Sequence, residues 1–258
     1  MKLYLPRLSC GQCSGELSSQ DDALIIEITD SNHYQATCPQ GHLATISIQA
    51  NKFEILFEMG AVALLEGYYR EAVANLAGAL ERFMEFYVSV MMIKAGINEK
   101  EFNETWKLVS NQSERQLGAF AFVYLNENKQ PPKYLSNNAI NFRNNVIHKG
   151  YIPTYQEVCK YGQAVLSFID PIFEGLKNNE EDWQYVLTLL RRNYSKLPNL
   201  TNTVGLLTTI TMSYHKYFTG ERDFQKEMED IPRKWAGSLG GPFYGVRGYI
   251  SENKPVTK

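Results

Sequence analysis

The sequence has little net charge, few cysteines and no long hydrophobic run. Each of these features excludes some classes of protein. Its 26 basic and 28 acidic side chains leave a formal net charge of −2, so contact with nucleic acid requires a local basic patch. No uncharged apolar stretch reaches the length of about 18 residues that a membrane span needs. We therefore expect no membrane partner.

The beginning of the chain lacks the features of export. Residues 1–11 have two positive charges but no apolar core long enough for a signal peptide. The cytoplasm is therefore the expected location, and there the four cysteines are metal ligands or free thiols rather than disulfides.

Residues 1–50 form a predicted module built on two pairs of metal ligands. Cys10 and Cys13 make a C-x-x-C pair, and Cys38 and His42 make a C-x-x-x-H pair. A tight turn lets both ligand atoms of a pair reach one tetrahedral ion, which is the geometry of a zinc ribbon. We predict one structural zinc per chain, closed by four protein ligands, and expect no catalytic metal.

The stretches around these pairs have strand character. Residues 23–29 are rich in β-branched side chains, and residues 44–48 alternate between apolar and polar positions. The fourth ligand stays open, because His33 competes with His42 for that place. A ribbon of this kind contacts nucleic acid or another protein, and the sequence favours neither.

From about residue 51 the periodicity becomes helical, which predicts a mainly α fold. The clearest helix ends at Gly96. Its apolar side chains recur at steps of three and four residues on one face: Val73, Leu76, Ala77, Leu80, Met84, Tyr87, Val88 and Met91. Further helices are expected over 53–66, 99–109 and 114–125, from about residue 134 to Gly150, and after a capping box formed by Thr154 and Glu157. Pro171 is expected to kink this last helix or to begin a new one.

The C-terminal part is predicted to add helices to this body. Residues 204–217 and 224–231 both look helical. We divide the chain into a ribbon module over 1–50, a helical domain over 51–177, a helical extension packed on the bundle over 178–236, and a mobile tail over 237–258. Cys159 is expected to be a small core or boundary residue.

Residues 141–150 gather the polar groups of the helical body. Arg143, two amides, His148 and Lys149 lie within seven residues. On a helix that turns about 100° per residue, Arg143 and His148 point about 140° apart. We therefore expect that they cannot meet on a regular helix face, and that they cooperate only at a helix end or across a dimer. Asn144 and His148, four residues apart, share a face.

The run from Arg143 to His148 resembles the R-[polar]-x-x-x-H signature of the HEPN superfamily, helical domains that include many metal-independent ribonucleases. Its place at a helix end, the short loop, and the cap of the next helix at Pro153-Thr154 match the family pattern. The amphipathic helix around residues 69–83 is similar to the family's earlier helix. The resemblance covers about residues 53–177, and it implies an antiparallel helical bundle.

The resemblance implies cleavage of RNA by its own 2′-hydroxyl, which leaves a 2′,3′-cyclic phosphate and needs no metal. His148 would transfer the proton, and Arg143 would stabilise the charge that develops on the phosphate. Asn144 would orient His148 or a phosphate oxygen, while Lys149 and Asn145 would bind the substrate. Members of this type pair as dimers whose motifs face each other, so a homodimer with a composite site is implied.

The resemblance also implies a biological setting. In prokaryotes such domains act in toxin or phage-defence systems, which implies an antitoxin or another defence partner. One alternative is a non-catalytic adaptor that binds RNA or protein, and another makes the zinc site the functional centre. Beside the apolar stripe, Glu81 could face the site, but the pattern favours a solvated boundary residue, and Arg70 is left undecided.

Overall fold

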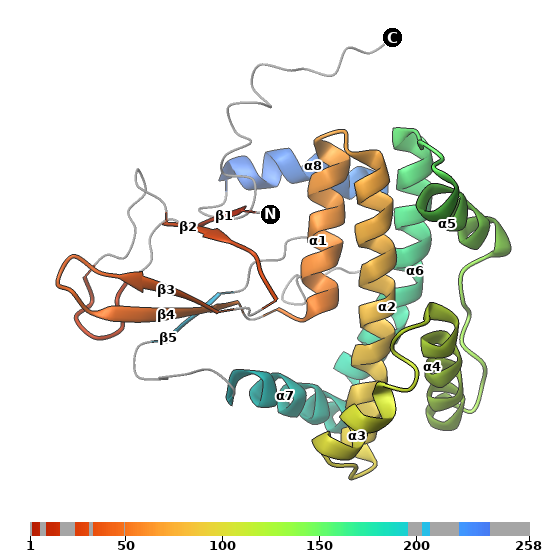
Figure 1. Cartoon of the computed structure of the whole chain (residues 1–258), viewed down its shortest axis with the longest axis horizontal. Coiled ribbons are helices and arrows are strands. Elements are labelled where there is room, and N and C mark those ends of the chain that lie inside the picture. The colour runs from red at the N-terminus through yellow and green to blue at the C-terminus, as the bar shows by residue number, and fades with distance from the viewer. Residues whose placement is uncertain are drawn as a thin grey trace. The chain divides into compact units, whose positions relative to one another are not determined.

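The computed structural model describes residues 2–5, 9–15, 24–30, 33–48, 50–195, 203–206 and 222–237. The described chain is mainly helical with small β-sheets, as predicted (Figure 1). It divides into two compact units. The first contains the strands, and the second runs from Asn51 to Ser195 and includes Phe224. Among the described residues, no helix combines the length and apolar character needed to cross a bilayer.

The first unit contains two small sheets. Strands β1 (Lys2–Leu5) and β2 (Leu24–Glu27) pair antiparallel. In the other sheet β4 (Leu43–Ile48) lies between β3 (His33–Thr37) and β5 (Thr203–Leu206). Strand β4 is antiparallel to β3 and parallel to β5. The strand character predicted around residues 23–29 and 44–48 is confirmed.

Strand β5 corrects the helix predicted over residues 204–217. The described part of that stretch, with Thr203 before it, is extended and pairs with β4 from Thr45 to Ile48. Apolar residues in so short a run fit a helix or a buried strand equally well, and only the partner strand decides between them. Residues 207–217 and the tail over 238–258 lie outside the described residues.

The second unit is built from seven consecutive helices of the described chain. Their bounds are α1 Lys52–Leu65, α2 Tyr69–Lys94, α3 Glu99–Trp106, α4 Ser113–Asn128, α5 Asn137–Lys149, α6 Tyr155–Asn178 and α7 Glu180–Ser195. A further helix, α8, spans Phe224–Gly237. Helix α2 is central, because α1, α4, α5, α6 and α7 all pack against it (Figure 1).

Helix α2 buries the predicted stripe. Every residue of the stripe from Val73 to Met91 is buried, and Gly96 follows the helix in a left-handed conformation with φ 75°. Phenylalanine rings join α2 to its neighbours: the Phe53 ring of α1 lies 5.2 Å from that of Phe83, and the Phe173 ring of α6 stacks on Phe86 at 5.9 Å. The second unit therefore has a core of its own.

Helix α6 begins at the predicted capping box. Thr154 Oγ1 accepts a hydrogen bond from the Glu157 N–H, and Glu157 Oε2 accepts one from the Thr154 N–H at 2.8 Å. Pro171 lies inside this helix, so no new helix begins there. Cys159 is buried, as predicted.

Residues Arg222 to Phe224 pack on α6. Gln163 Oε1 accepts a hydrogen bond from the Phe224 N–H at 2.7 Å, and Arg222 pairs with Asp170 at 3.1 Å. The Phe224 ring lies directly over Gly162, where an added Cβ would be 2.5 Å from Phe224 Cζ. Only a residue without a side chain allows this approach.

Two glycines of α6 give a matched test of that packing. Gly162→Ala is expected to lower the free energy of unfolding by about 1–3 kcal/mol, because the methyl group overlaps the Phe224 ring. Gly175→Ala is expected to raise it by about 0.5–1 kcal/mol, because nothing lies within 4 Å of its added Cβ and alanine favours a helix. Urea unfolding followed by circular dichroism measures both. Equal effects at the two positions would contradict the contact.

Candidate functional site

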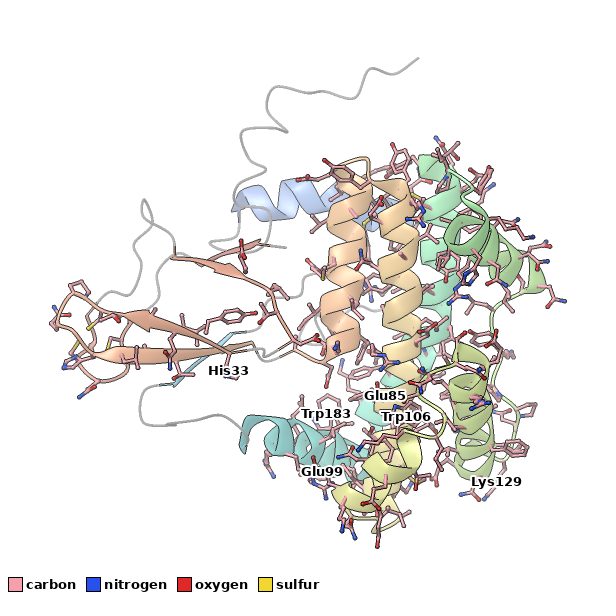
Figure 2. The ribbon with its side chains drawn as sticks, in the orientation of Figure 1. His33, Glu85, Glu99, Trp106, Lys129 and Trp183 are labelled. Atoms are coloured by element: carbon pink, nitrogen blue, oxygen red, sulfur yellow. The ribbon has the colours of Figure 1, made fainter. Side chains whose placement is uncertain are left out.

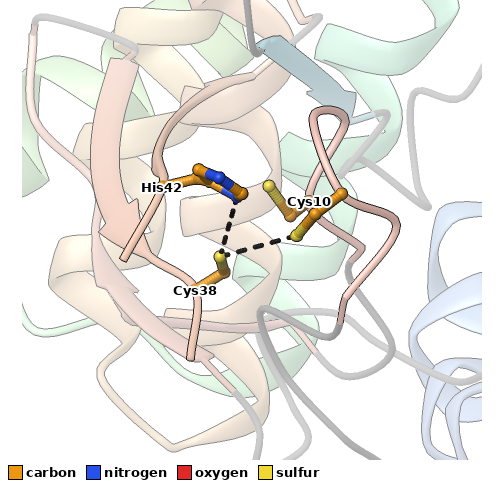
Figure 3. A group of neighbouring side chains, drawn as sticks. Cys10, Cys38 and His42 are labelled. Atoms are coloured by element: carbon orange, nitrogen blue, oxygen red, sulfur yellow. Dashed lines mark hydrogen bonds between the residues drawn. The ribbon is translucent and has the colours of Figure 1, made fainter. Parts of the chain in front are cut away.

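The two ligand pairs of the first unit meet in one cluster. The ligand atoms of Cys10, Cys13, Cys38 and His42 all lie within 4.8 Å of one another. Figure 3 shows Cys10, Cys38 and His42 turned toward a common centre. Cys13 Sγ is 3.8 Å from Cys38 Sγ, which is 3.7 Å from His42 Nδ1. We call these four residues the metal-ligand cluster, because they could hold a metal ion.

The spacing of these atoms fits a tetrahedral ion. Metal–sulfur bonds of about 2.3 Å, as in zinc sites, place two ligands of a tetrahedron about 3.8 Å apart. The separations of Cys38 Sγ from Cys13 Sγ and from His42 Nδ1 have this size. Cys10 and Cys38 are buried, His42 is half-buried and Cys13 is exposed. Four protein ligands would leave no open position on the ion, so the cluster suits a structural role.

Tight turns hold each pair of ligands. The Cys10 N–H donates to the Gly15 carbonyl at 2.7 Å, and the Cys38 N–H donates to the His42 carbonyl at 3.0 Å. Gly41 completes the second turn with φ 82°, and Ser14 takes the corresponding left-handed conformation in the first, with φ 56°. These turns point both members of each pair to the same side.

Crowding of the thiols affects their ionisation. A hydrogen bond with the Gly15 backbone lowers the pKa of Cys13, but desolvation and the neighbouring thiols of Cys10 and Cys38 together raise it above its ordinary value. Thiolates at this spacing repel one another. A divalent cation removes that repulsion, since a metal-bound thiol loses its proton.

The structure decides between the two histidines that competed for the fourth place. His42 belongs to the metal-ligand cluster, whereas His33 begins β3, five residues before Cys38 (Figure 2). A strand advances about 3.3 Å per residue, which puts the two positions roughly 16 Å apart along the chain. The cluster is therefore Cys10, Cys13, Cys38 and His42, as predicted.

A second candidate site lies where α5 faces α2 within the helical unit. Arg143 Nη2 donates to Glu81 Oε1 at 3.0 Å. Arg143 Nη1 donates to Asn144 Oδ1 at 3.0 Å and lies 3.4 Å from His148 Nε2. One guanidinium thus joins a carboxylate, an amide and an imidazole. We call Glu81, Arg143, Asn144 and His148 the α5 cluster.

The contact between Arg143 and His148 corrects the prediction that they cannot meet on a regular helix, although it involves the last turn of α5, at the helix end where their cooperation was expected. Helix α5 is regular from Asn137 to Lys149 and ends, as predicted, at Gly150 with φ 72°. The two side chains nevertheless meet on it. Their Cα–Cβ directions diverge, but the long arginine stem runs along the helix surface and carries the guanidinium toward the last turn. Neither a frayed end nor a partner chain is needed for this contact.

Glu81 corrects a second prediction, since it is not a solvated boundary residue. It forms an ion pair with Arg143 in which the side chains are 26% and 20% exposed, respectively. Solvent therefore screens this pair less than a surface pair. Arg70, by contrast, has a half-exposed side chain 4.0 Å from Glu71.

The other predicted site residues lie around the end of α5. Asn144 binds Arg143 rather than His148. The backbone carbonyl of Asn145 accepts hydrogen bonds from the N–H groups that follow the helix. His148 and Lys149 are exposed. The outer face of the cluster therefore presents an imidazole and an ammonium group to solvent.

Two tyrosines near Arg143 are uncharged. Burial raises the pKa of Tyr134 to about 12; Arg143 lowers it, and Glu81 raises it. Burial also raises the pKa of Tyr161 well above its ordinary value, against the lowering effect of Arg143. Both phenols stay protonated at neutral pH, so they add no charge to the cluster.

Comparison of the chain with protein-family models, with curated proteins and with solved structures finds no match. The functional argument therefore rests on the two clusters. One holds ligand atoms for a metal ion. The other places a cation and an imidazole at one exposed point, which suits the binding of an anion and the transfer of a proton.

Proposed function

We propose that this chain is a HEPN-type endoribonuclease that cleaves RNA without a catalytic metal. The substrate's own 2′-hydroxyl attacks the adjacent phosphate, the P–O5′ bond breaks, and the two products end in a 2′,3′-cyclic phosphate and a 5′-hydroxyl. The observation that carries the proposal is the 3.4 Å approach of Arg143 Nη1 to His148 Nε2. It brings a phosphate-binding fork and a proton-transfer group to one point, in the order of the signature that the sequence resembles.

The contacts of the α5 cluster suggest a role for each side chain. A guanidinium only donates hydrogen bonds, so His148 Nε2 is the acceptor in a hydrogen bond between the two groups. When Arg143 turns to a bound phosphate, this nitrogen is released and can take the proton of the 2′-hydroxyl as a general base. Arg143 stabilises the charge on the phosphate, and Glu81 and Asn144 position Arg143.

Substrate and a second copy of the chain complete the proposed site. Lys149, exposed beside His148, binds the RNA backbone together with the Asn145 amide. Two copies pair as a homodimer with their α5 clusters facing, which doubles the cations and imidazoles around one phosphate. The resemblance also supports a role as a toxin or phage-defence effector, acting with an antitoxin or another defence partner.

Zinc is the proposed occupant of the metal-ligand cluster. Three thiolates and one imidazole in a tetrahedral arrangement favour Zn²⁺ over harder cations. Its role is structural, because four protein ligands leave no open position for a water or a substrate.

Cleavage of RNA in the absence of free metal tests the proposed function. Zinc-loaded protein is incubated with labelled single-stranded RNA in buffer without magnesium, and the product ends are identified by mass spectrometry. We expect 2′,3′-cyclic phosphate ends with the wild-type chain, and loss of cleavage with Arg143→Ala. An oligonucleotide with 2′-deoxynucleotides throughout lacks the attacking 2′-hydroxyl and should not be cleaved. Cleavage of that substrate, or equal activity of Arg143→Ala, would refute the mechanism.

One observation favours the adaptor alternative. Glu81 already pairs with Arg143, which reduces the positive charge available to a phosphate. In that case the chain binds RNA or protein without cutting. A gel-shift experiment that recovers intact RNA from a stable complex would support the adaptor, whereas recovery of shortened RNA supports the enzyme.

Removing the charge of Glu81 tests whether this residue positions Arg143, as distinct from affecting the binding of RNA. Glu81→Gln is expected to lower kcat about 10-fold, because Arg143 loses a partly buried, charge-assisted hydrogen bond worth roughly 1–2 kcal/mol. KM for RNA should fall or stay unchanged, since a negative charge is removed from the site.

The matched control is Glu85→Gln. Glu85, labelled in Figure 2, lies one turn further along α2 and pairs with Arg82 instead. Glu85→Gln should leave kcat and KM unchanged. A Glu81→Gln enzyme with wild-type kcat would show that the ion pair does not position Arg143.

A further inference from the structure

An aromatic ring lies exposed beside the α5 cluster. Tyr151 follows α5 after Gly150, three residues beyond His148, and 44% of its surface is exposed. The next residue, Ile152, is 80% exposed. A ring as exposed as this one contributes little to the core, which raises the question of what it contacts.

Hydrogen bonds hold this ring at both ends. The Tyr151 N–H donates to the Asn145 carbonyl of α5 at 3.1 Å, and its hydroxyl donates to Glu157 Oε1 at 2.7 Å. Glu157 is itself held by the capping box of α6. The ring also meets Phe142 edge to face, with centroids 6.4 Å apart. A ligand that stacks on Tyr151 therefore loses little affinity to ordering of the side chain.

The ring is also electrically neutral at physiological pH. The hydrogen bond to Glu157 raises the pKa of Tyr151, and hydrogen bonds from Thr154 and Tyr151 lower the pKa of Glu157. The phenol keeps its proton as donor and the carboxylate stays ionised as acceptor. A neutral ring does not repel a phosphate backbone.

We propose that Tyr151 is a stacking platform for an unpaired base of the RNA that binds at the α5 cluster. The inference rests on the proposed function. Bases in a duplex are stacked on one another and cannot lie on a side chain, whereas unpaired bases stack readily on aromatic rings. His148 and Lys149, within three residues of Tyr151, are both exposed, so they are available to the phosphate of a nucleotide whose base lies on the ring.

Binding of an RNA analogue that cannot be cut tests the platform directly. The probe is a single-stranded 2′-deoxy oligonucleotide containing 2-aminopurine, whose fluorescence is quenched when the base stacks. Tyr151→Leu is expected to weaken binding about 5- to 150-fold, the contribution of one stacked base, and to abolish the quenching. Tyr151→Phe keeps the ring but loses the hydrogen bond to Glu157, and it should bind within about twofold of wild type.

Two controls isolate the ring from general surface effects. Ile152→Ala removes the adjacent exposed side chain, and Phe122→Leu removes a 76% exposed ring on α4. Both should bind the probe as the wild type does. Circular dichroism confirms that each variant is folded. Equal weakening by Tyr151→Phe and Tyr151→Leu would overturn the platform, because the hydrogen bond rather than the ring would then carry the effect.

The same variants separate failure of the platform from failure of the ribonuclease. If wild type quenches the probe but does not cut RNA, the ribonuclease proposal fails and the platform stands. If wild type cuts RNA while Tyr151→Leu has an unchanged Kd and KM, the platform alone fails. Cleavage of duplex RNA as fast as single-stranded RNA also overturns it.

Discussion

His148→Ala is expected to lower the rate of RNA cleavage about 10²- to 10⁴-fold, the usual contribution of a general acid or base. The side chain is exposed in the last turn of α5, so its removal costs the core nothing and the variant should fold. Single-turnover cleavage of labelled RNA measures the loss. Binding of an uncleavable analogue should change only a few-fold, because Arg143 and Lys149 remain.

The control for this experiment is His33→Gln, which changes an imidazole outside both clusters. It should cleave RNA at the wild-type rate. The double variant Arg143→Ala/His148→Ala should be hardly slower than either single variant, since groups that act as one unit lose their effect together. If the rate of the double variant falls by the product of the two single losses, the two residues act independently. Cleavage by His148→Ala at the wild-type rate would show that His148 has no part in the mechanism.

Loss of the metal ion is expected to unfold the first unit and leave the helical unit folded. The described strands of the first unit are four to six residues long and form sheets of only two and three strands, which are marginally stable without further support. Zinc bound to thiolates and imidazole contributes about 10–16 kcal/mol to folding in small metal sites. The helical unit has the phenylalanine core around α2 and needs no metal. Hydrogen exchange with and without a strong chelator measures the two units separately.

A pair of cysteine variants tests the ligand set. Elemental analysis is expected to find zinc in the wild type and none in Cys10→Ser, because this variant removes a buried thiol of the metal-ligand cluster. Cys159→Ala removes a buried thiol of α6 outside the cluster and should keep its zinc. Retention of zinc by Cys10→Ser, or protection of the first unit after chelation, would contradict a structural metal there.

Features that depend on neighbouring residues could be predicted from the sequence. The stripe of α2 follows from apolar residues at the helical period, and the start of α6 follows from Thr154 and Glu157, three residues apart. The metal-ligand cluster follows the same rule, because a short turn brings both members of each pair to one side. Within the stripe, the capping box and each ligand pair, the residues that interact are close in sequence, so spacing alone carries the geometry. The meeting of the two pairs, in which Cys13 and Cys38 are 25 positions apart, was predicted instead from the four ligands that a tetrahedral ion needs.

Contacts between distant residues were decided only by the tertiary structure. Glu81 and Arg143 are 62 positions apart, and β5 pairs with β4 from the opposite end of the chain. Neither partner has a local signal: a glutamate beside an apolar stripe looks solvated, and a short apolar run fits helix or strand. The meeting of Arg143 with His148 was missed for another reason, since helical angles describe where a side chain starts and not where a long one ends. By itself the sequence determined the helices, the ligand pairs and the polar segment of α5; packing decided which side chains share a site, because that depends on how the helices pack and on side-chain conformation.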